Sequence, residues 1–317
     1  MLSYTRKKET IKMAKVKNFK TIFPAVSVPL NDDYSINEPE FRAYLRWIKT
    51  FYGKGMDGLV CNGHTGEITG LTRAERKRVV EICAEECGDV MTIISGVNCE
   101  NTAESIEMAK EAKEAGADGI LLMPPHMWLR FGMNPDAPFE YVKDVAEGAD
   151  IDIIIHLYPA TSKAFYPVET LIKMCKEIDH VKCIKMGTRV TSIYEHDVRL
   201  LRQECPDISL ITCHDETLCV SWFPGMDGAL IGFAGCVPEI ICPAREVFAN
   251  PDKHTLKEAQ DWSDRIYHIS QAIYGGGQPS GEAHARLKEA LKQRGIFKSA
   301  LMRKPVLPLN QEEKDWV

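Results

Sequence analysis

Gly-Met-Asp-Gly-Leu-Val, at residues 55–60, is a short stretch that the chain repeats. It recurs as Gly-Ala-Asp-Gly-Ile-Leu at residues 116–121 and as Gly-Met-Asp-Gly-Ala-Leu at residues 225–230. Each copy follows a segment that looks helical and opens an apolar stretch typical of a strand. The first glycine suits the end of a helix, and the second suits a tight entry into a strand. Repeated connections from a helix into a strand predict parallel strands that are linked by crossover helices.

Eight strands are expected between the helical stretches. The candidates are Ile22–Val28, Gly58–Cys61, Thr92–Ser95, Gly119–Met123, Asp152–His156, Val181–Lys185, Ser209–Thr212 and Ala229–Gly232. Eight strand–helix units predict an α/β fold of the TIM (β/α)8 barrel type with a C-terminal helical extension. We expect a basic N-terminal arm at residues 1–18, the barrel at residues 19–250, and a C-terminal helical region with a tail at residues 251–317.

The composition is that of a globular enzyme, with 44% apolar residues, 26% charged residues and a net charge of -6. This charge argues against a nucleic-acid partner. No apolar run reaches the length of a membrane span, and no secretory signal is visible. The eleven cysteines include no Cys-x-x-Cys pair, so we expect reduced thiols in a cytoplasmic protein. We interpret the basic arm as solvated, with Met13 as an alternative start.

Lys185 ends the apolar stretch Val181-Lys182-Cys183-Ile184-Lys185 of the sixth expected strand. The two-residue period of strands places it on the same face as Val181 and Cys183. An amine held in a dry pocket loses its proton more easily, and a neutral amine attacks carbonyl carbons. Lys185 is therefore a candidate for an imine-forming nucleophile. The alternative is a lysine at a strand end that reaches the surface or pairs with a carboxylate.

Polar residues follow several other expected strands, and in TIM barrels the chemistry lies at the C-terminal ends of the strands. Gly63-His64-Thr65-Gly66 follows the second strand, where backbone N–H groups and the Thr65 hydroxyl could hold a carboxylate. A plain turn is the alternative, because glycine is common there. The fourth strand leads into His126-Met127-Trp128, the fifth into His156-Leu157-Tyr158-Pro159, and the seventh into His214-Asp215.

These motifs resemble those of the dihydrodipicolinate synthase / N-acetylneuraminate lyase family. Residues 63–76, with Gly-His-Thr-Gly-Glu and Leu-Thr-x-x-Glu, are similar to its GTTGE…LTxxE signature. Residues 95–97 resemble its A-G-x loop, residues 303–309 resemble its R-x-P-x-x-P-L tail, and Lys185 falls where the family places its imine-forming lysine. The resemblance covers nearly the whole chain. It implies a class I (metal-free) lyase that acts on a pyruvate-like 2-oxo acid and assembles as a homotetramer.

The chain also departs from this family's pattern. His64 replaces the first threonine of the loop, and His156 replaces the tyrosine of Tyr-x-x-Pro that relays protons, although Tyr158 would point to the same side of the strand. Thr161 replaces an arginine of true dihydrodipicolinate synthases. We therefore interpret the chain as a divergent member. Trp128 lies in a segment similar to that of the hydratase-aldolases that cleave benzylidenepyruvates, where a tryptophan borders an apolar pocket; a core tryptophan is the alternative.

The sequence thus predicts an aldolase or dehydratase in which Lys185 forms the imine. Proton carriers would come from His156, Tyr158 and His64, because the unperturbed pKa of histidine, about 6.5, lies near neutrality. The candidate substrate-binding residues are Gly63, Thr65, Gly66, Trp128 and Thr161. We expect a small 2-oxo acid as the partner, with no metal, no cofactor, no nucleic acid and no membrane.

Two other classes of protein stay open. A metal-dependent barrel enzyme could use histidines near the strand ends, with carboxylates beside them. Its ligands would come from His64, His126, His156, His214, Glu67 and Asp215, although no His-x-His or His-x-x-x-His pair occurs. A non-catalytic homologue could bind a 2-oxo acid without converting it, since the relay tyrosine is replaced.

Overall fold

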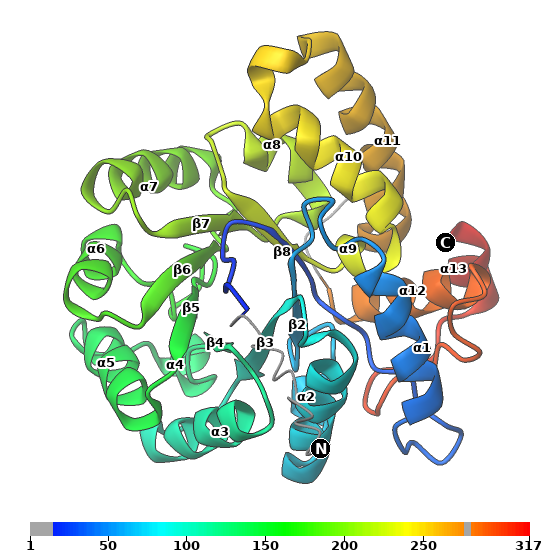
Figure 1. Cartoon of the computed structure of the whole chain (residues 1–317), viewed down its shortest axis with the longest axis horizontal. Coiled ribbons are helices and arrows are strands. Elements are labelled where there is room, and N and C mark those ends of the chain that lie inside the picture. The colour runs from blue at the N-terminus through cyan, green and yellow to red at the C-terminus, as the bar shows by residue number, and fades with distance from the viewer. Residues whose placement is uncertain (1–14, 276–279) are drawn as a thin grey trace, which may run out of the picture.

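Eight parallel strands form a barrel in the computed structural model, which describes residues 15–275 and 280–317 (Figure 1). The strands are β1 (Ile22–Pro24), β2 (Gly58–Cys61), β3 (Thr92–Val97), β4 (Gly119–Leu122), β5 (Asp152–His156), β6 (Val181–Met186), β7 (Ser209–Thr212) and β8 (Gly228–Ile231). They pair in the order β1-β8-β7-β6-β5-β4-β3-β2. Ala25, directly after β1, closes the ring through a parallel bridge to Val60 of β2. The predicted TIM barrel is confirmed, with shifts only at the strand ends.

Helices cover the outside of this barrel (Figure 1). The longer ones are α1 (Glu38–Lys49), α2 (Arg73–Cys87), α3 (Thr102–Glu114), α5 (Ala137–Ala149), α6 (Val168–Glu177), α7 (Thr191–Glu204) and α10 (Pro238–Ala249). Shorter segments are η1 (Ile68–Gly70), α4 (Met127–Phe131), η2 (Asp215–Thr217), α8 (Leu218–Trp222), α9 (Phe233–Cys236) and η3 (Pro251–Lys253). No helix in the part of the chain that the structure describes is long and apolar enough to cross a membrane.

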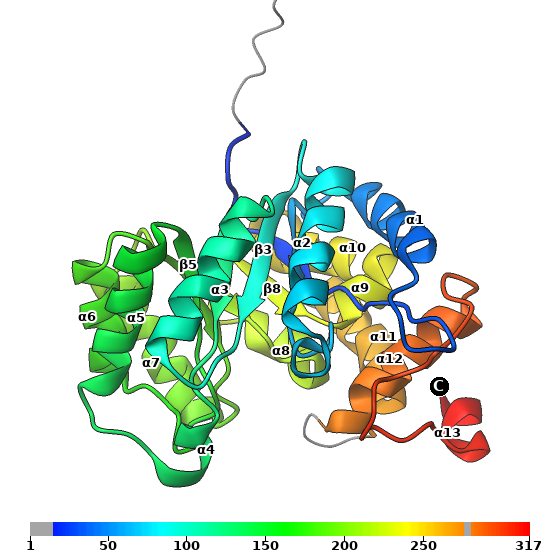
Figure 2. The same cartoon turned by 90° about the horizontal axis from the view of Figure 1, so that it is seen from below.

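The C-terminal helical region consists of α11 (Leu256–Tyr274), α12 (Gly281–Gln293) and α13 (Gln311–Trp316). Helix α11 packs against α10 and α8, and α12 packs against α9. In Figure 2 the first described residues lie at one end of the barrel, and α4 and α12 lie toward the other end. The C-terminal region therefore lies near the C-terminal ends of the strands.

The glycine repeat has the same backbone role in its three copies. The first glycine of each copy has a φ between 89° and 103°, which is the left-handed region that glycine enters without strain. The second glycine leaves no room for a side chain. A Cβ at Gly58 would lie 2.4 Å from the ring of Phe23, and one at Gly228 would lie 1.9 Å from the carbonyl oxygen of Thr21. The repeat is therefore a strand-entry motif at the crowded start of the barrel strands.

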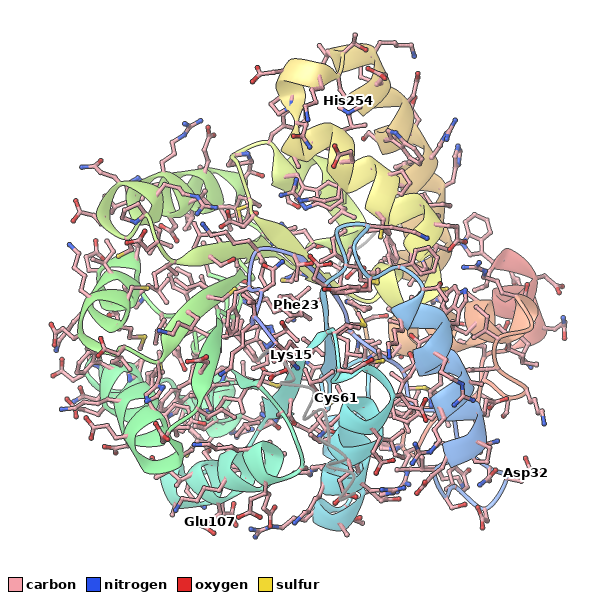
Figure 3. The ribbon with its side chains drawn as sticks, in the orientation of Figure 1. Lys15, Phe23, Asp32, Cys61, Glu107 and His254 are labelled. Atoms are coloured by element: carbon pink, nitrogen blue, oxygen red, sulfur yellow. The ribbon has the colours of Figure 1, made fainter. Side chains whose placement is uncertain are left out.

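The N-terminal arm, which the structure describes from Lys15, contacts the barrel. Lys15 Nζ donates to the carbonyls of Gly88 and Met91, at 3.1 and 2.8 Å, and pairs with the carboxylate of Asp118. In the view of Figure 3, Lys15 lies over the middle of the barrel. The expectation of a solvated arm is wrong for this part, because the ammonium finds three acceptors at the N-terminal ends of the strands. The rest of the arm, with Met13, lies outside the described residues.

The eleven cysteines are free thiols, and nine of them are buried. Burial raises the pKa of several of these thiols, including those of Cys87 and Cys242, to about 12. Such thiols stay protonated at neutral pH and pack as small apolar groups, as the sequence predicted.

Candidate active site

A cavity of about 410 Å³ lies at the C-terminal ends of the strands. Six of the predicted site residues line it: Gly63, His64, Thr65, His156, Tyr158 and Lys185. They come from the loop after β2, the end of β5 and the end of β6. The barrel thus brings together residues that lie more than 100 positions apart in the sequence.

Lys185 faces this cavity from the end of β6, where it pairs in register with His156 of β5. The register shifts between Ile153 and Ile154, so that Lys182 of β6 has no partner in β5 and points to solvent. Burial lowers the pKa of Lys185; the carboxyl of Asp215 opposes this effect and the charge of Arg189 adds to it. Burial therefore shifts Lys185 toward its neutral form, which is the nucleophilic one.

The candidate proton carriers are in contact with one another. Tyr158 Oη lies 3.3 Å from His64 Nε2, at hydrogen-bonding distance. The ring of His156 packs edge-on against Tyr158, with centroids 4.9 Å apart, and its centroid lies 5.6 Å from that of His64. The hydroxyl of Tyr158 can therefore exchange a proton with His64, whereas His156 contacts both rings through its own ring.

These three side chains are uncharged at neutral pH. Burial, reinforced by the charge of Lys185, lowers the pKa of His64 to about 3 and that of His156 well below its usual range. Burial also raises the pKa of Tyr158. His156 Nδ1 is buried and finds no hydrogen-bond partner among the residues that the structure describes. The site thus combines a neutral phenol as donor with neutral imidazoles as acceptors.

The loop after β2 presents its backbone as a donor surface. Within the described chain, the N–H groups of residues 63–66 donate no backbone hydrogen bond. Asn62 and Glu67 flank these residues with φ values of 52° and 57°, which turn the backbone sharply at both ends of the loop. Adjacent free N–H groups of this kind can bind a carboxylate.

A buried ion pair holds this loop against the C-terminal region. The Glu67 carboxylate pairs with Lys288 of α12, whose side chain is 0% exposed. Glu67 also accepts from the backbone N of Arg303 at 2.7 Å, and Lys288 donates to the Leu301 carbonyl at 2.8 Å. Each charge is therefore paired and hydrogen-bonded, as a buried ion pair requires.

Two residues that line the cavity, His284 and Arg189, were not predicted, and a third, Asp215, was considered only as a metal ligand. His284 reaches the cavity from α12, and burial lowers its pKa to about 4. Asp215 follows β7; its carboxylate accepts from the backbone N of Phe233 at 2.8 Å, and burial raises its pKa to about 7. Arg189 follows β6. The strand-end rule selected Asp215 and could have selected Arg189, but His284 lies outside the eightfold pattern and had no such signal.

Three predicted substrate-binding residues do not line the cavity. Trp128 packs edge-on against Tyr141 and Tyr166, with centroids 5.7 and 6.3 Å away, so it belongs to the packing beneath α4. Thr161 is exposed in the loop after β5. Gly66 is buried, and a Cβ there would lie 3.0 Å from the Val26 carbonyl oxygen. The missing side chain therefore lets the loop pack closely against the chain after β1.

The histidines considered as metal ligands do not gather in one place. His64, His126 and His156 line the cavity, but His214 lies in a neighbouring cavity and packs on Tyr194, with ring centroids 4.9 Å apart. The Glu67 carboxylate is paired with Lys288. Within residues 15–275 and 280–317, no group of three or more His, Cys, Asp or Glu side chains is placed to hold a metal ion.

Comparison with known proteins assigns the family. The family model of the dihydrodipicolinate synthetase family matches residues 18–317, so the chain belongs to this family. It is 26% identical to a 4-hydroxy-tetrahydrodipicolinate synthase of Bartonella bacilliformis, over 92% of this chain and 93% of the relative. It is 25% identical to a DapA-like lyase of Thermofilum pendens, over 90% and 91% of the two chains. The resemblance read from the motifs is thereby confirmed.

Solved structures agree on the fold. YagE, a prophage protein of the dihydrodipicolinic acid synthase family from E. coli K12 in complex with pyruvate, matches with a TM-score of 0.83 and 20% identity. The match covers 94% of this chain and 95% of YagE. Dihydrodipicolinate synthase from Aquifex aeolicus matches with a TM-score of 0.81 and 19% identity, over 94% and 95% of the two chains.

Replacing Lys288 with Met should destabilise the protein, because the Glu67 carboxylate would stay buried without its cation. We expect the free energy of unfolding, measured by urea denaturation, to fall by about 3–5 kcal/mol. The double variant K288M/E67Q removes both charges and should lose much less. Lys110→Met, which breaks an exposed pair with Glu107, is the control and should change little. A K288M variant as stable as this control would contradict the role of the ion pair.

Proposed function

We propose that the protein is a class I lyase that acts on a pyruvate-like 2-oxo acid through an imine at Lys185. The observation that carries this proposal is the position of the Lys185 amine. It faces the cavity from the end of β6, its pKa is lowered by burial, and Gly63, His64 and Thr65 of the donor loop line the same cavity. Two structural neighbours, YagE and the dihydrodipicolinate synthase of Acinetobacter baumannii, are described in complex with pyruvate, which supports the same substrate class here.

The first step is attack of the neutral Lys185 amine on the ketone carbon of the 2-oxo acid. The substrate carboxylate binds the backbone N–H groups of the loop and the Thr65 hydroxyl. Proton transfer to the resulting carbinolamine expels its hydroxyl as water and leaves a protonated imine. The Tyr158 hydroxyl supplies this proton, and His64, hydrogen-bonded to it at 3.3 Å, exchanges protons with it.

The protonated imine then acts as an electron sink. The bond between C3 and C4 of the substrate can break beside it, because the electron pair of that bond moves into the imine as an enamine, and it forms by the reverse step. In a dehydration, C3 loses a proton to give the enamine, which then expels the C4 hydroxyl as water. Protonation of the enamine carbon and hydrolysis of the imine return the free lysine. The same residues therefore serve either an aldolase or a dehydratase.

The second reactant distinguishes members of this class. An aromatic aldehyde, a sugar-derived acid and a hydroxyproline-derived imino acid are the candidates. A panel of aldehydes and sugar acids, assayed with the wild-type protein and with His156→Phe, would identify the reactant. Turnover of any member of the panel would exclude a non-catalytic role, and activity that resists chelators would exclude a metal-dependent one.

Reduction with borohydride in the presence of pyruvate should trap a covalent adduct on Lys185. Peptide mass spectrometry should locate one reduced pyruvate on this residue, and Lys185→Ala should give no adduct. Lys182→Ala is the matched control, because Lys182 lies on the same strand, is exposed and donates to the Asp179 carbonyl at 2.6 Å. If folded protein gives no adduct with any 2-oxo acid, the imine mechanism is wrong.

Tyr158→Phe should slow proton transfer while the lysine stays intact. The measurement is the exchange of the C3 protons of pyruvate with D₂O, followed by ¹H NMR, because this exchange passes through the imine and the enamine. We expect the rate to fall by roughly 10²–10⁴-fold, the usual contribution of a proton carrier. His156→Phe, which removes no hydrogen bond to His64, should fall much less. If His156→Phe slows the exchange more than Tyr158→Phe does, His156 is the proton carrier.

We also propose a cytoplasmic homotetramer. The family resemblance and the reduced thiols support this assembly and compartment. Size-exclusion chromatography with light scattering should give four times the chain mass of 35.7 kDa. A monomer or a dimer at assay concentration would contradict the tetramer and leave the proposed chemistry untouched.

A further inference from the structure

Arg189 is a charged side chain of the cavity that the proposed reaction does not use. It lies four residues after Lys185, and its side chain is only 18% exposed. It lines the same cavity as Lys185 and His156, and its charge contributes to the lowered pKa of both. Among the described residues that line the cavity, Lys185 and Arg189 are the lysine and arginine side chains.

Two of the three guanidinium nitrogens of Arg189 bind protein groups. Nε donates to the carboxylate of Glu216, and Nη1 donates to the carbonyl of Gly187 at 3.1 Å. The second terminal nitrogen, Nη2, has no hydrogen bond to any residue that the structure describes. Because a guanidinium carries five N–H donors in a planar fork, this side chain is held in place and still has donors to offer.

The other titratable groups around the cavity do not cancel this positive charge. His64, His156 and His284 are neutral at pH 7, since burial lowers their pKa values. Asp215 is charged only in part, because burial raises its pKa to about 7. The carboxylate paired with the guanidinium is that of Glu216, which accepts from Nε and leaves Nη2 available to an anion that enters the cavity.

We propose that Arg189 determines specificity by binding a second carboxylate, carried on the substrate chain beyond C3. The inference rests on the proposed function, in which the first carboxylate binds the loop of residues 63–66 and the ketone carbon meets Lys185. A charge-assisted bond between a guanidinium and a carboxylate is stronger than a neutral hydrogen bond and suits the planar fork. The substrates are therefore 2-oxo acids with two carboxylates.

The test compares 2-oxoglutarate with 2-oxopentanoate, two 2-oxo acids of equal chain length that differ in the terminal carboxylate. Binding is measured by calorimetry in Lys185→Ala protein, which cannot form the imine. We expect 2-oxoglutarate to bind about tenfold to hundredfold more tightly, the range for a hydrogen bond to a charged group. Adding Arg189→Gln together with Glu216→Gln should abolish the difference, and removing both charges avoids leaving a carboxylate without its cation.

Arg199→Gln is the matched control. Arg199 lines a neighbouring cavity of about 330 Å³ that also includes Arg189, and it pairs with Glu195 at 2.6 Å. It should leave the preference for 2-oxoglutarate unchanged. Equal binding of the two acids to Lys185→Ala protein, a preference that survives the double replacement, or loss of the preference in Arg199→Gln would each overturn the role of Arg189. Absence of a borohydride adduct in the wild-type protein would overturn the imine mechanism alone, because the calorimetric comparison does not require an imine.

Discussion

Desolvation at the mouth of the barrel sets the charge of the groups that surround Lys185. Removing an amine and several imidazoles from water disfavours their protonated forms, and the remaining positive charges act in the same direction. The pKa values of His64 and His284 fall to about 3 and about 4, whereas that of the Asp215 carboxyl rises to about 7. The burial that lowers the pKa of Lys185 therefore also lowers the pKa of the histidines that line the same cavity.

The barrel alone does not complete this cavity. Helix α12 brings His284 to its wall and, one turn further on, Lys288 to the carboxylate of Glu67. The backbone of Arg303 binds the same carboxylate. The C-terminal region therefore contributes both a wall of the site and the ion pair that anchors the donor loop, although it lies outside the eightfold repeat.

Local patterns in the sequence were enough to predict the barrel and much of the site. The glycine repeat identified three strand entries, and the position of Lys185 in its strand indicated the cavity because residues after parallel strands meet at one end of the barrel. Trp128 could not be placed in this way, since the same ring suits a pocket or an aromatic cluster, and here it packs on Tyr141. His284 could not be predicted, because its position depends on how α12 packs against the finished barrel. Such packing leaves no periodic signal in the chain.

The loop of residues 63–66 has free backbone N–H groups and, at position 64, a side chain that hydrogen-bonds Tyr158. Its free donors are main-chain N–H groups, flanked by Asn62 and Glu67 with their positive φ angles. A side chain in this loop can therefore change without loss of the donors. Position 64 carries histidine where the family pattern has threonine, and this imidazole hydrogen-bonds Tyr158. In the proposed mechanism the backbone N–H groups bind the substrate carboxylate and the side chain at position 64 handles protons, so a lineage can acquire a new proton carrier here while it retains the backbone anchor.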